Sequence, residues 1–209
     1  MPNTVFINFR GGIISPGDLY NILLAAQKIK VPYVRFGLRQ QLLVDLEDYN
    51  IPNFTEELDV LNMQYEVNTN QYPNIISSFP AEEVFIRNTW LSEGVYKDIF
   101  DAIDYKPTLK VNICDSNQSF TRMLTGNINW AASVDSPHYW HLIIRFPKTN
   151  IIYEWDQLCY TNDIPKVTKA IEQIITSSPS AYIDNVNADG MQLFSALKTD
   201  NLNIKPAEK

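Results

Sequence analysis

The 209-residue sequence contains few of the residues that hold metal ions and clusters, with two cysteines and two histidines in all. Cys114 and Cys159 lie far apart, and neither has another cysteine close by. An iron–sulfur cluster needs about four thiolates, and a structural zinc needs about four ligands, usually in closely spaced pairs. We therefore expect that this chain cannot hold a 4Fe-4S cluster or a structural zinc by itself.

The two histidines, His138 and His141, lie in a run of alternating aromatic and apolar residues. They are three positions apart, and on a β-strand such positions point to opposite faces of the sheet. We therefore predict that the pair does not chelate a metal ion, and no other metal site is predicted.

The sequence also lacks a surplus of basic residues and a long apolar run. Lysine and arginine total 17 against 24 acidic residues, which gives a formal charge of −7 and a pI of about 4.8. Binding to nucleic acid relies on a basic face, and a transmembrane helix needs about 18 or more consecutive apolar residues. The first residues do not resemble a basic leader followed by an apolar stretch. We expect a soluble protein of the cytoplasm that binds neither nucleic acid nor membrane.

Common catalytic motifs are missing as well. The sequence has no Walker loop, GxSxG elbow, HExxH helix or glycine-rich dinucleotide fingerprint. No catalytic residue is therefore predicted, and whether the chain is an enzyme stays open.

The first 70 residues alternate between strand and helix patterns. A strand is predicted over residues 4–9, and a helix follows Ser15, which suits the N-cap, and Pro16, which suits the first helical position. One face of that helix is apolar and comprises Leu19, Ile22, Leu23, Ala26 and Ile29. Two short strands around Gly37, a helix over 54–63 and a strand over 64–68 complete the order strand, helix, strand, strand, helix, strand. This order is typical of a ferredoxin-like unit.

A second unit is predicted beyond a turn-rich boundary near residue 70. It contains a helix over 91–105, four strand candidates, and a helix over about 164–175. The predicted fold class is α+β: a ferredoxin-like N-terminal half-domain over 1–70, then a second α/β sandwich unit with a mixed or antiparallel sheet over 71–178. Residues 179–209 are expected to form a C-terminal helix and a polar tail that resembles a linker.

Arg39 stands out in the stretch YVRFGLRQQLLVDL, residues 33–46, because it is set between apolar runs near the start of the second predicted strand. A guanidinium is costly to bury unless it meets a carboxylate, a phosphate or another anion. The simplest interpretation places Arg39 on the solvent face or pairs it with Asp45 or Glu47. The alternative is a site that binds an anion.

Several segments resemble the nitrite and sulfite reductase family. GGIISPGDLYNILLAAQKI followed by FGLRQQ is similar to its ferredoxin-like half-domain with an RQ motif, and YPNIISS, KPTLKVNICD and LTGNINWAAS are similar to later segments of the first-half sirohaem-type domain. The resemblance implies one half of a sirohaem enzyme that reduces nitrite or sulfite. The cofactor-binding residues that it implies are Arg39, Gln40, Asn74 and Lys110.

The departures from the family pattern also carry information. Pro73 and Thr108 stand where the family has an arginine and a lysine, and the cluster cysteines are missing. The resemblance therefore implies sirohaem as cofactor but no 4Fe-4S cluster from this chain alone. It implies as partners a second reductase-like half or a homodimer partner, together with an electron-donor protein.

Two other functions are compatible with the sequence. The first is a non-catalytic binding or scaffold module that docks a redox partner, suggested by the missing basic residues and by the aromatic side chains Trp130, Tyr139, Trp140, Tyr153 and Trp155. Such aromatics more often belong to a core. The second is a ferredoxin-like sensor of small molecules, which would have a closed pocket without arginine.

Overall fold

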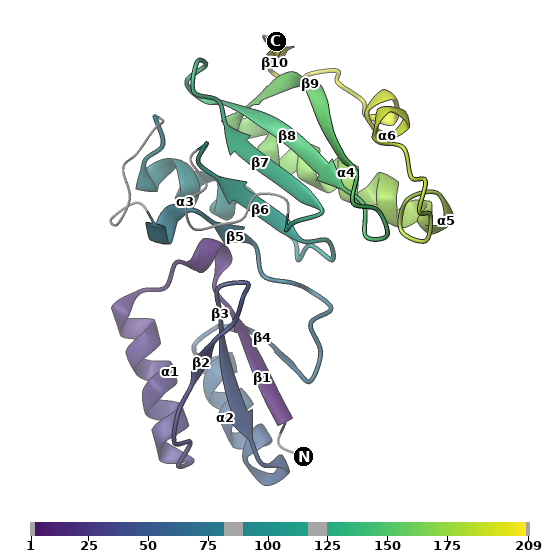
Figure 1. The fold of residues 1–209 in the computed structure, drawn as a ribbon. Coiled ribbons are helices and arrows are strands. Elements are labelled where there is room, and N and C mark those ends of the chain that lie inside the picture. Colours follow the sequence, from purple (N-terminus) through teal and green to yellow (C-terminus); the bar gives the residue numbers. More distant parts are fainter. Residues whose placement is uncertain (1–2, 82–89, 117–124, 208–209) are drawn as a thin grey trace. The chain divides into compact units, whose positions relative to one another are not determined.

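The computed structural model describes residues 3–81, 90–116 and 125–207 (Figure 1). The chain divides into two compact units, Met1–Ile75 and Ile76–Lys209. Each unit has its own β-sheet.

The first unit is a four-stranded antiparallel sheet with two α-helices. Its elements, in chain order, are β1 (Asn3–Asn8), η1 (Arg10–Gly12), α1 (Pro16–Lys28), β2 (Arg35–Phe36), β3 (Gln41–Leu46), η2 (Asp48–Asn50), α2 (Ile51–Val60) and β4 (Gln64–Val67). The strand order is β2-β3-β1-β4, and every neighbouring pair is antiparallel. This is the arrangement of a ferredoxin-like unit, so the predicted fold class is confirmed for this part.

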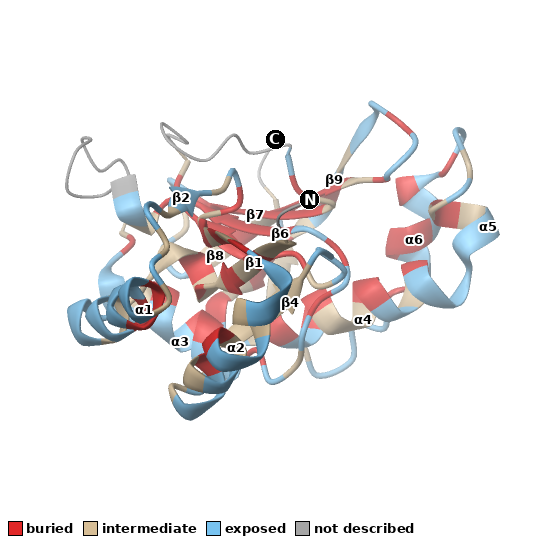
Figure 2. Cartoon of the chain, turned by 90° about the horizontal axis from the view of Figure 1, so that it is seen from below, coloured by how far each residue is buried: buried red, intermediate tan, exposed pale blue. Residues whose placement is uncertain are grey.

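The core of the first unit lies between the sheet and its helices. Val5 pairs with Val44 and Ile7 pairs with Leu42, so these four buried side chains share one face of the sheet. They belong to one buried cluster with Ile22, Ala25, Ala26, Phe54 and Leu58 from α1 and α2. Figure 2 shows the buried residues along the strands and the inner sides of these helices.

Helix α1 begins where its capping residues predict. Ser15 Oγ accepts a hydrogen bond from Asp18 N at 3.0 Å, and Pro16 occupies the first turn. Leu23, predicted to face the core, is instead 40% exposed. The core face is centred on Ile22 and Ala26, and Leu23 is one residue (about 100°) around the helix from Ile22.

Helix α2 begins at Ile51, earlier than predicted, and Pro52 lies in its first turn. Proline is well suited to that position because its missing N–H has no partner in a helix there.

Replacement of Ser15 tests this cap. Ser15→Ala removes the acceptor for Asp18 N and should lower the free energy of unfolding of the first unit by about 1 kcal/mol. Asn50→Ala is the matched control, because Asn50 occupies the N-cap position of α2 without a side-chain cap hydrogen bond. Urea denaturation monitored by circular dichroism measures both. Equal losses in the two variants would contradict a specific cap at Ser15.

The second unit contains a six-stranded mixed sheet. Its elements are β5 (Ile76–Ser77), η3 (Phe79–Ala81), α3 (Glu93–Ala102), β6 (Val111–Cys114), β7 (Ile128–Ala132), β8 (Tyr139–Arg145), β9 (Ile152–Tyr160), η4 (Thr161–Asp163), α4 (Ile164–Ser177), α5 (Pro179–Tyr182), α6 (Gly190–Ala196) and β10 (Ile204–Pro206). The strand order is β10-β9-β8-β7-β6-β5. Strands β5, β6 and β7 are parallel and the remaining pairs are antiparallel, so the sheet is mixed, which is one of the two predicted arrangements.

The large aromatic side chains of this sheet belong to its core. Trp130 and Trp140 are fully buried, and Trp155 is 4% exposed. Trp130 Nε1 donates to Thr168 Oγ1 in α4, and Trp140 Nε1 donates to Thr161 Oγ1 in η4, both at 2.9 Å. Burial of these rings removes the main reason to expect an aromatic docking patch on these strands.

Residues 204–206 form a strand and not part of a linker, contrary to the sequence-based expectation. Ile204 pairs with Cys159 and Pro206 with Gln157, so β10 is a strand of the sheet. Helix α6 packs on β9 at Gly190, where an added Cβ would lie 2.2 Å from Tyr153 Cγ. The long-range pairing explains the error, because a short polar segment shows no strand pattern of its own.

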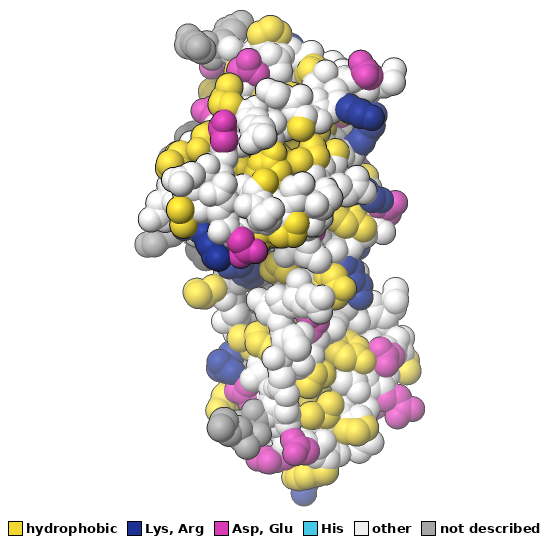
Figure 3. All heavy atoms as spheres, turned by 90° about the vertical axis from the view of Figure 1, so that its right-hand side faces the viewer, with side chains coloured by type: hydrophobic (Ala, Val, Ile, Leu, Met, Phe, Trp, Pro, Cys, Tyr) yellow, Lys and Arg dark blue, Asp and Glu magenta, His cyan; other side chains and the backbone are white. Residues whose placement is uncertain are grey.

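Among the described residues, no helix is long and apolar enough to cross a membrane. On the face drawn in Figure 3, basic and acidic side chains are interspersed, and apolar side chains lie among polar ones.

Candidate functional site

Arg39 lies in the turn between β2 and β3, two residues before the strand in which it was predicted. Gly37 N donates to Gln41 O at 2.8 Å, and Gln40 N donates to Gly37 O at 3.0 Å, which closes the turn. The Arg39 residue is 8% exposed, so its guanidinium is not on the solvent face. Its Nε and Nη2 donate to the main-chain oxygen of Asn74 at 2.9 and 2.7 Å.

Asn74 returns hydrogen bonds to the same turn. Its Nδ2 donates to Arg39 O at 2.8 Å, to Gln40 O at 3.3 Å and to Phe9 O at 2.7 Å. Gln40 has a φ of 56°, a left-handed conformation that is unfavourable for a residue with a side chain. The structure thus brings Arg39, Gln40 and Asn74 together, and we call this group the Arg39–Asn74 clamp.

Asp45, which was considered as a partner for Arg39, forms an ion pair with Arg35 instead. Arg35 Nη2 lies 2.7 Å from Asp45 Oδ1, and Arg35 Nε donates to Asp45 Oδ2 at 3.1 Å. Partial burial favours a higher pKa for Asp45, but hydrogen bonds from Arg35 and Thr4 and the guanidinium charge hold its pKa below the usual value. Register explains this choice, since Arg35 lies opposite Leu43 and next to Asp45 on the same face.

The clamp should contribute far more to stability than the exposed pair. Arg39→Met leaves the Asn74 carbonyl without its charged donors and should lower the free energy of unfolding by about 2 kcal/mol or more. Arg35→Met is the matched control and should cost less than about 1 kcal/mol, because its ion pair is partly exposed. Chemical denaturation of both variants gives the comparison. A loss at Arg39 no larger than the loss at Arg35 would refute a structural role of the clamp.

Lys110, the fourth residue implied by the resemblance, belongs to the second unit and directly precedes β6. Its side chain is exposed. Because side chains alternate along a strand, Lys110, Asn112 and Cys114 share one face, and Val111 and Ile113 share the other. Ile113 pairs with Trp130, and the Trp130 indole donates a hydrogen bond to Thr168 in α4, so the face with Val111 and Ile113 is the one covered by α4. The face with Lys110 is therefore turned away from α4.

Two buried asparagines lie on that face and were missed by the sequence analysis. Asn112 and Asn129 are paired across β6 and β7, and their side-chain amides are 2.9 Å apart. Asn129 also accepts from Gly126 N at 3.1 Å and donates to Ile143 O at 3.2 Å. Polar residues alternating with apolar ones in LKVNIC are the signal that could have identified Asn112. We call Lys110, Asn112 and Asn129 the β6 polar face.

A buried carboxylate holds the segment that leads to Lys110. Glu172 in α4 is 6% exposed, and its Oε1 accepts hydrogen bonds from Thr108 N, Thr108 Oγ1 and Leu109 N. Glu172 Oε2 and Tyr105 Oη are buried without a hydrogen-bond partner among the described residues. Burial, followed by the charge of Glu172, raises the pKa of Tyr105 strongly. An acidic side chain therefore neighbours Thr108, the position at which the resembling family has a lysine.

Removal of this carboxylate should loosen the segment. Glu172→Ala leaves the N–H groups of Thr108 and Leu109 without their acceptor and should lower the free energy of unfolding of the second unit by about 2 kcal/mol. Gln173→Ala, an exposed neighbour on the same helix, should change it by less than about 0.5 kcal/mol. Thermal and urea unfolding of both variants would show this difference. A loss below about 0.5 kcal/mol at Glu172 would contradict the assigned role.

The histidines and cysteines have structural neighbours. His141 Nδ1 lies 2.9 Å from Glu154 Oε1, and the His138 ring contacts the ring of Trp90, with centroids 5.0 Å apart. Cys114 and Cys159 are buried thiols, and burial together with the charge of Asp163 raises the pKa of Cys159 to about 12. Among the described residues, no group of three or more His, Cys, Asp or Glu side chains could hold a metal ion.

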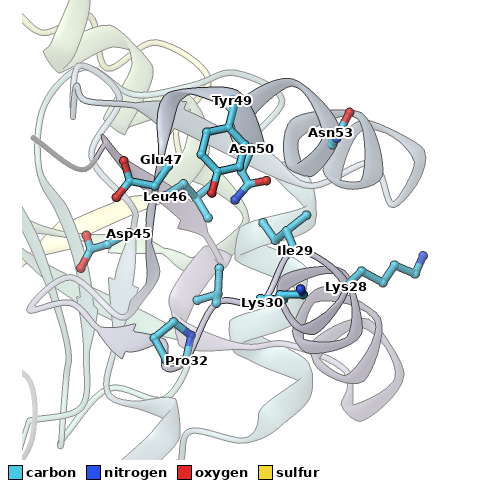
Figure 4. A pocket seen from close by; sticks show the side chains of 11 residues that line it. Lys28, Ile29, Lys30, Pro32, Asp45, Leu46, Glu47, Tyr49, Asn50 and Asn53 are labelled. Carbon is cyan, nitrogen blue, oxygen red and sulfur yellow. The ribbon is translucent and has the colours of Figure 1, made fainter.

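A surface cleft of about 530 Å³ lies in the first unit. Figure 4 shows Ile29, Lys30 and Pro32 from the end of α1 and the loop after it across from Leu46, Glu47 and Tyr49. Two of the charged side chains that line it are already paired, Lys28 with Glu57 and Asp45 with Arg35. No arginine lines the cleft, but it is open to solvent and not the closed pocket expected of a sensor.

Comparison with known proteins shows a relationship in structure and not in sequence. No protein-family model matches this sequence, and no curated protein matches it significantly. The structure is similar to that of Mycobacterium tuberculosis NirA, of the nitrite/sulfite reductase family, with a TM-score of 0.60 and 13% sequence identity. The match covers 93% of this chain and 37% of the NirA chain. The chain therefore has a NirA-like fold, over little more than a third of that protein's length.

Proposed function

We propose that this chain is one half of a nitrite/sulfite reductase-like redox protein of the cytoplasm, in which catalysis requires a second half. The observation that carries this proposal is the NirA-like fold over 93% of the chain, which corresponds to 37% of the NirA chain. The motifs quoted above occur in the same order along the sequence. The second half and an electron donor are the partners that we propose.

The β6 polar face is the part of this chain that we assign to a small anion such as nitrite or sulfite. Lys110 supplies an exposed ammonium group, and Asn112 and Asn129 on the same face are buried and hydrogen-bonded to each other, so they fix the strand pair that carries it. A cation stabilises an anion, and more strongly where water is partly excluded.

The described residues do not fit sirohaem by themselves. The carboxylates of that macrocycle need several cations, whereas Arg39 and Asn74 bond to one another in the clamp. Thr108 and its neighbour Leu109 hydrogen-bond the Glu172 carboxylate, which would repel an anionic cofactor. A second half would have to supply the cations that bind sirohaem, and we derive no catalytic step through it.

The second candidate is a non-catalytic module that keeps the fold and docks a redox partner. The engagement of Arg39 inside the clamp favours this candidate, because it leaves fewer cations for a ligand. The burial of Trp130 and Trp140 weighs against docking through these aromatic side chains.

Titration with nitrite, followed by NMR, tests the proposed anion face. Amide shifts should centre on residues 110–112, and Lys110→Ala should weaken binding about tenfold, because a charge-assisted contact contributes about 1.5–3 kcal/mol. Lys106→Ala removes an exposed lysine from the preceding loop and should leave the affinity unchanged. Chloride at matched ionic strength controls for screening.

Absence of shifts at residues 110–112, or equal effects of the two lysine variants, would reject the anion face. That result would leave the docking module as the better candidate.

A further inference from the structure

Strand β2 is an exposed edge of the first sheet with apolar side chains around it. It pairs with β3 on one side, and no strand among the described residues pairs with its other side (Figure 1). Tyr33 is 63% exposed, Phe36 is 75% exposed and Leu38 is fully exposed at 102%. Exposed apolar edges invite pairing with another chain, and folded proteins usually protect them.

The opposite edge of the same sheet is protected. Glu66 in β4 accepts hydrogen bonds from Gln71 N at 3.0 Å and from Tyr72 N at 3.1 Å, and also from the Thr69 hydroxyl. These bonds hold the chain after β4 beside that strand, and they place a carboxylate there. The two edges therefore differ, and β2 is the unprotected edge of this sheet.

The backbone of β2 is arranged to accept an antiparallel partner at Phe36. Gly37 N donates a hydrogen bond to Gln41 O. Hydrogen-bonded and non-hydrogen-bonded pairs alternate along an antiparallel ladder, so Arg35 and Leu43 form the next hydrogen-bonded pair. Phe36, opposite Leu42, is then a non-bonded position, and its N–H and C=O point away from β3. A second strand could accept and donate both hydrogen bonds there.

We propose that β2 pairs with β2 of a second copy of this chain, in antiparallel orientation, with Phe36 opposite Phe36. A two-fold axis perpendicular to the sheet keeps both rings on the face that carries Leu42, the face covered by helices. The same register places Leu38 opposite Val34 and Arg35 opposite Gly37. A shift of one residue in each copy would place Arg35 opposite Arg35, which like-charge repulsion disfavours.

The exposed area suits a dimer that forms at moderate concentration. The rings of Tyr33 and Phe36 together expose on the order of 250 Å² in each copy, about a third of the roughly 800 Å² that each partner buries in a standard interface. Leu38 and the strand backbone add to this. Arg35 is paired with Asp45, so the edge adds little net charge to a contact between two chains of charge −7. Added salt should therefore strengthen the dimer, because it screens the overall repulsion.

Analytical ultracentrifugation of the full chain tests this proposal. A concentration-dependent monomer–dimer equilibrium is expected, and Phe36→Lys should weaken it at least tenfold. Val60→Lys is the matched control, since Val60 is 79% exposed on α2 of the same unit and should leave the dimer unchanged. A chain that stays monomeric, or a dimer that both lysine variants weaken equally, would overturn the proposal.

Cross-linking tests the register separately. Bonded antiparallel positions have Cα atoms about 5.5 Å apart, which is within the range of a disulfide. Phe36→Cys should give a disulfide-linked dimer on mild oxidation, whereas Val60→Cys should not. The native Cys114 and Cys159 are buried and serve as an internal control. If Phe36→Cys forms no more disulfide-linked dimer than Val60→Cys does, the proposed pairing of Phe36 with Phe36 is wrong.

The proposed function does not depend on this dimer, and a failed nitrite titration leaves the dimer result unaffected.

Discussion

The buried guanidinium of Arg39 needs hydrogen-bond acceptors, and the structure of the first unit depends on how it finds them. Arg39 meets it at the main-chain oxygen of Asn74, and the Asn74 side chain returns three hydrogen bonds to main-chain oxygens of Phe9, Arg39 and Gln40. The end of β1, the β2–β3 turn and the last residues of the unit are joined in this way. The clamp also supports Gln40 in its left-handed conformation, so a costly backbone geometry and a costly buried charge stabilise each other.

Charge is distributed in the second unit in a way that limits its use for anions. Lys110 is exposed on the β6 polar face, whereas Glu172 accepts three hydrogen bonds from Thr108 and Leu109 just before it. A carboxylate that accepts hydrogen bonds from the two residues before Lys110 adds negative charge to this segment of the chain.

Local signals explain which elements were predicted well. Ser15, Pro16 and Asp18 determine the start of α1 through contacts within one turn, so the sequence was sufficient there. The order of strands and helices in the first unit followed from periodicity. The burial of the Arg39 guanidinium against Asn74, the exposure of Leu23 and the strand β10 did not, because each depends on contacts with residues far away in the sequence. Asn112 and Glu172 were missed for the same reason, since a polar residue in a strand or helix does not reveal its partner.

The sequence by itself determined the α+β class, the ferredoxin-like order of elements and the scarcity of metal ligands, because these follow from local propensity and composition. Only the tertiary structure decided which arginine pairs with Asp45, where the Arg39 guanidinium lies, and which side chain approaches Thr108. The physical reason is that buried charges and amides are placed by hydrogen-bond partners tens of residues away, and sheet register selects those partners.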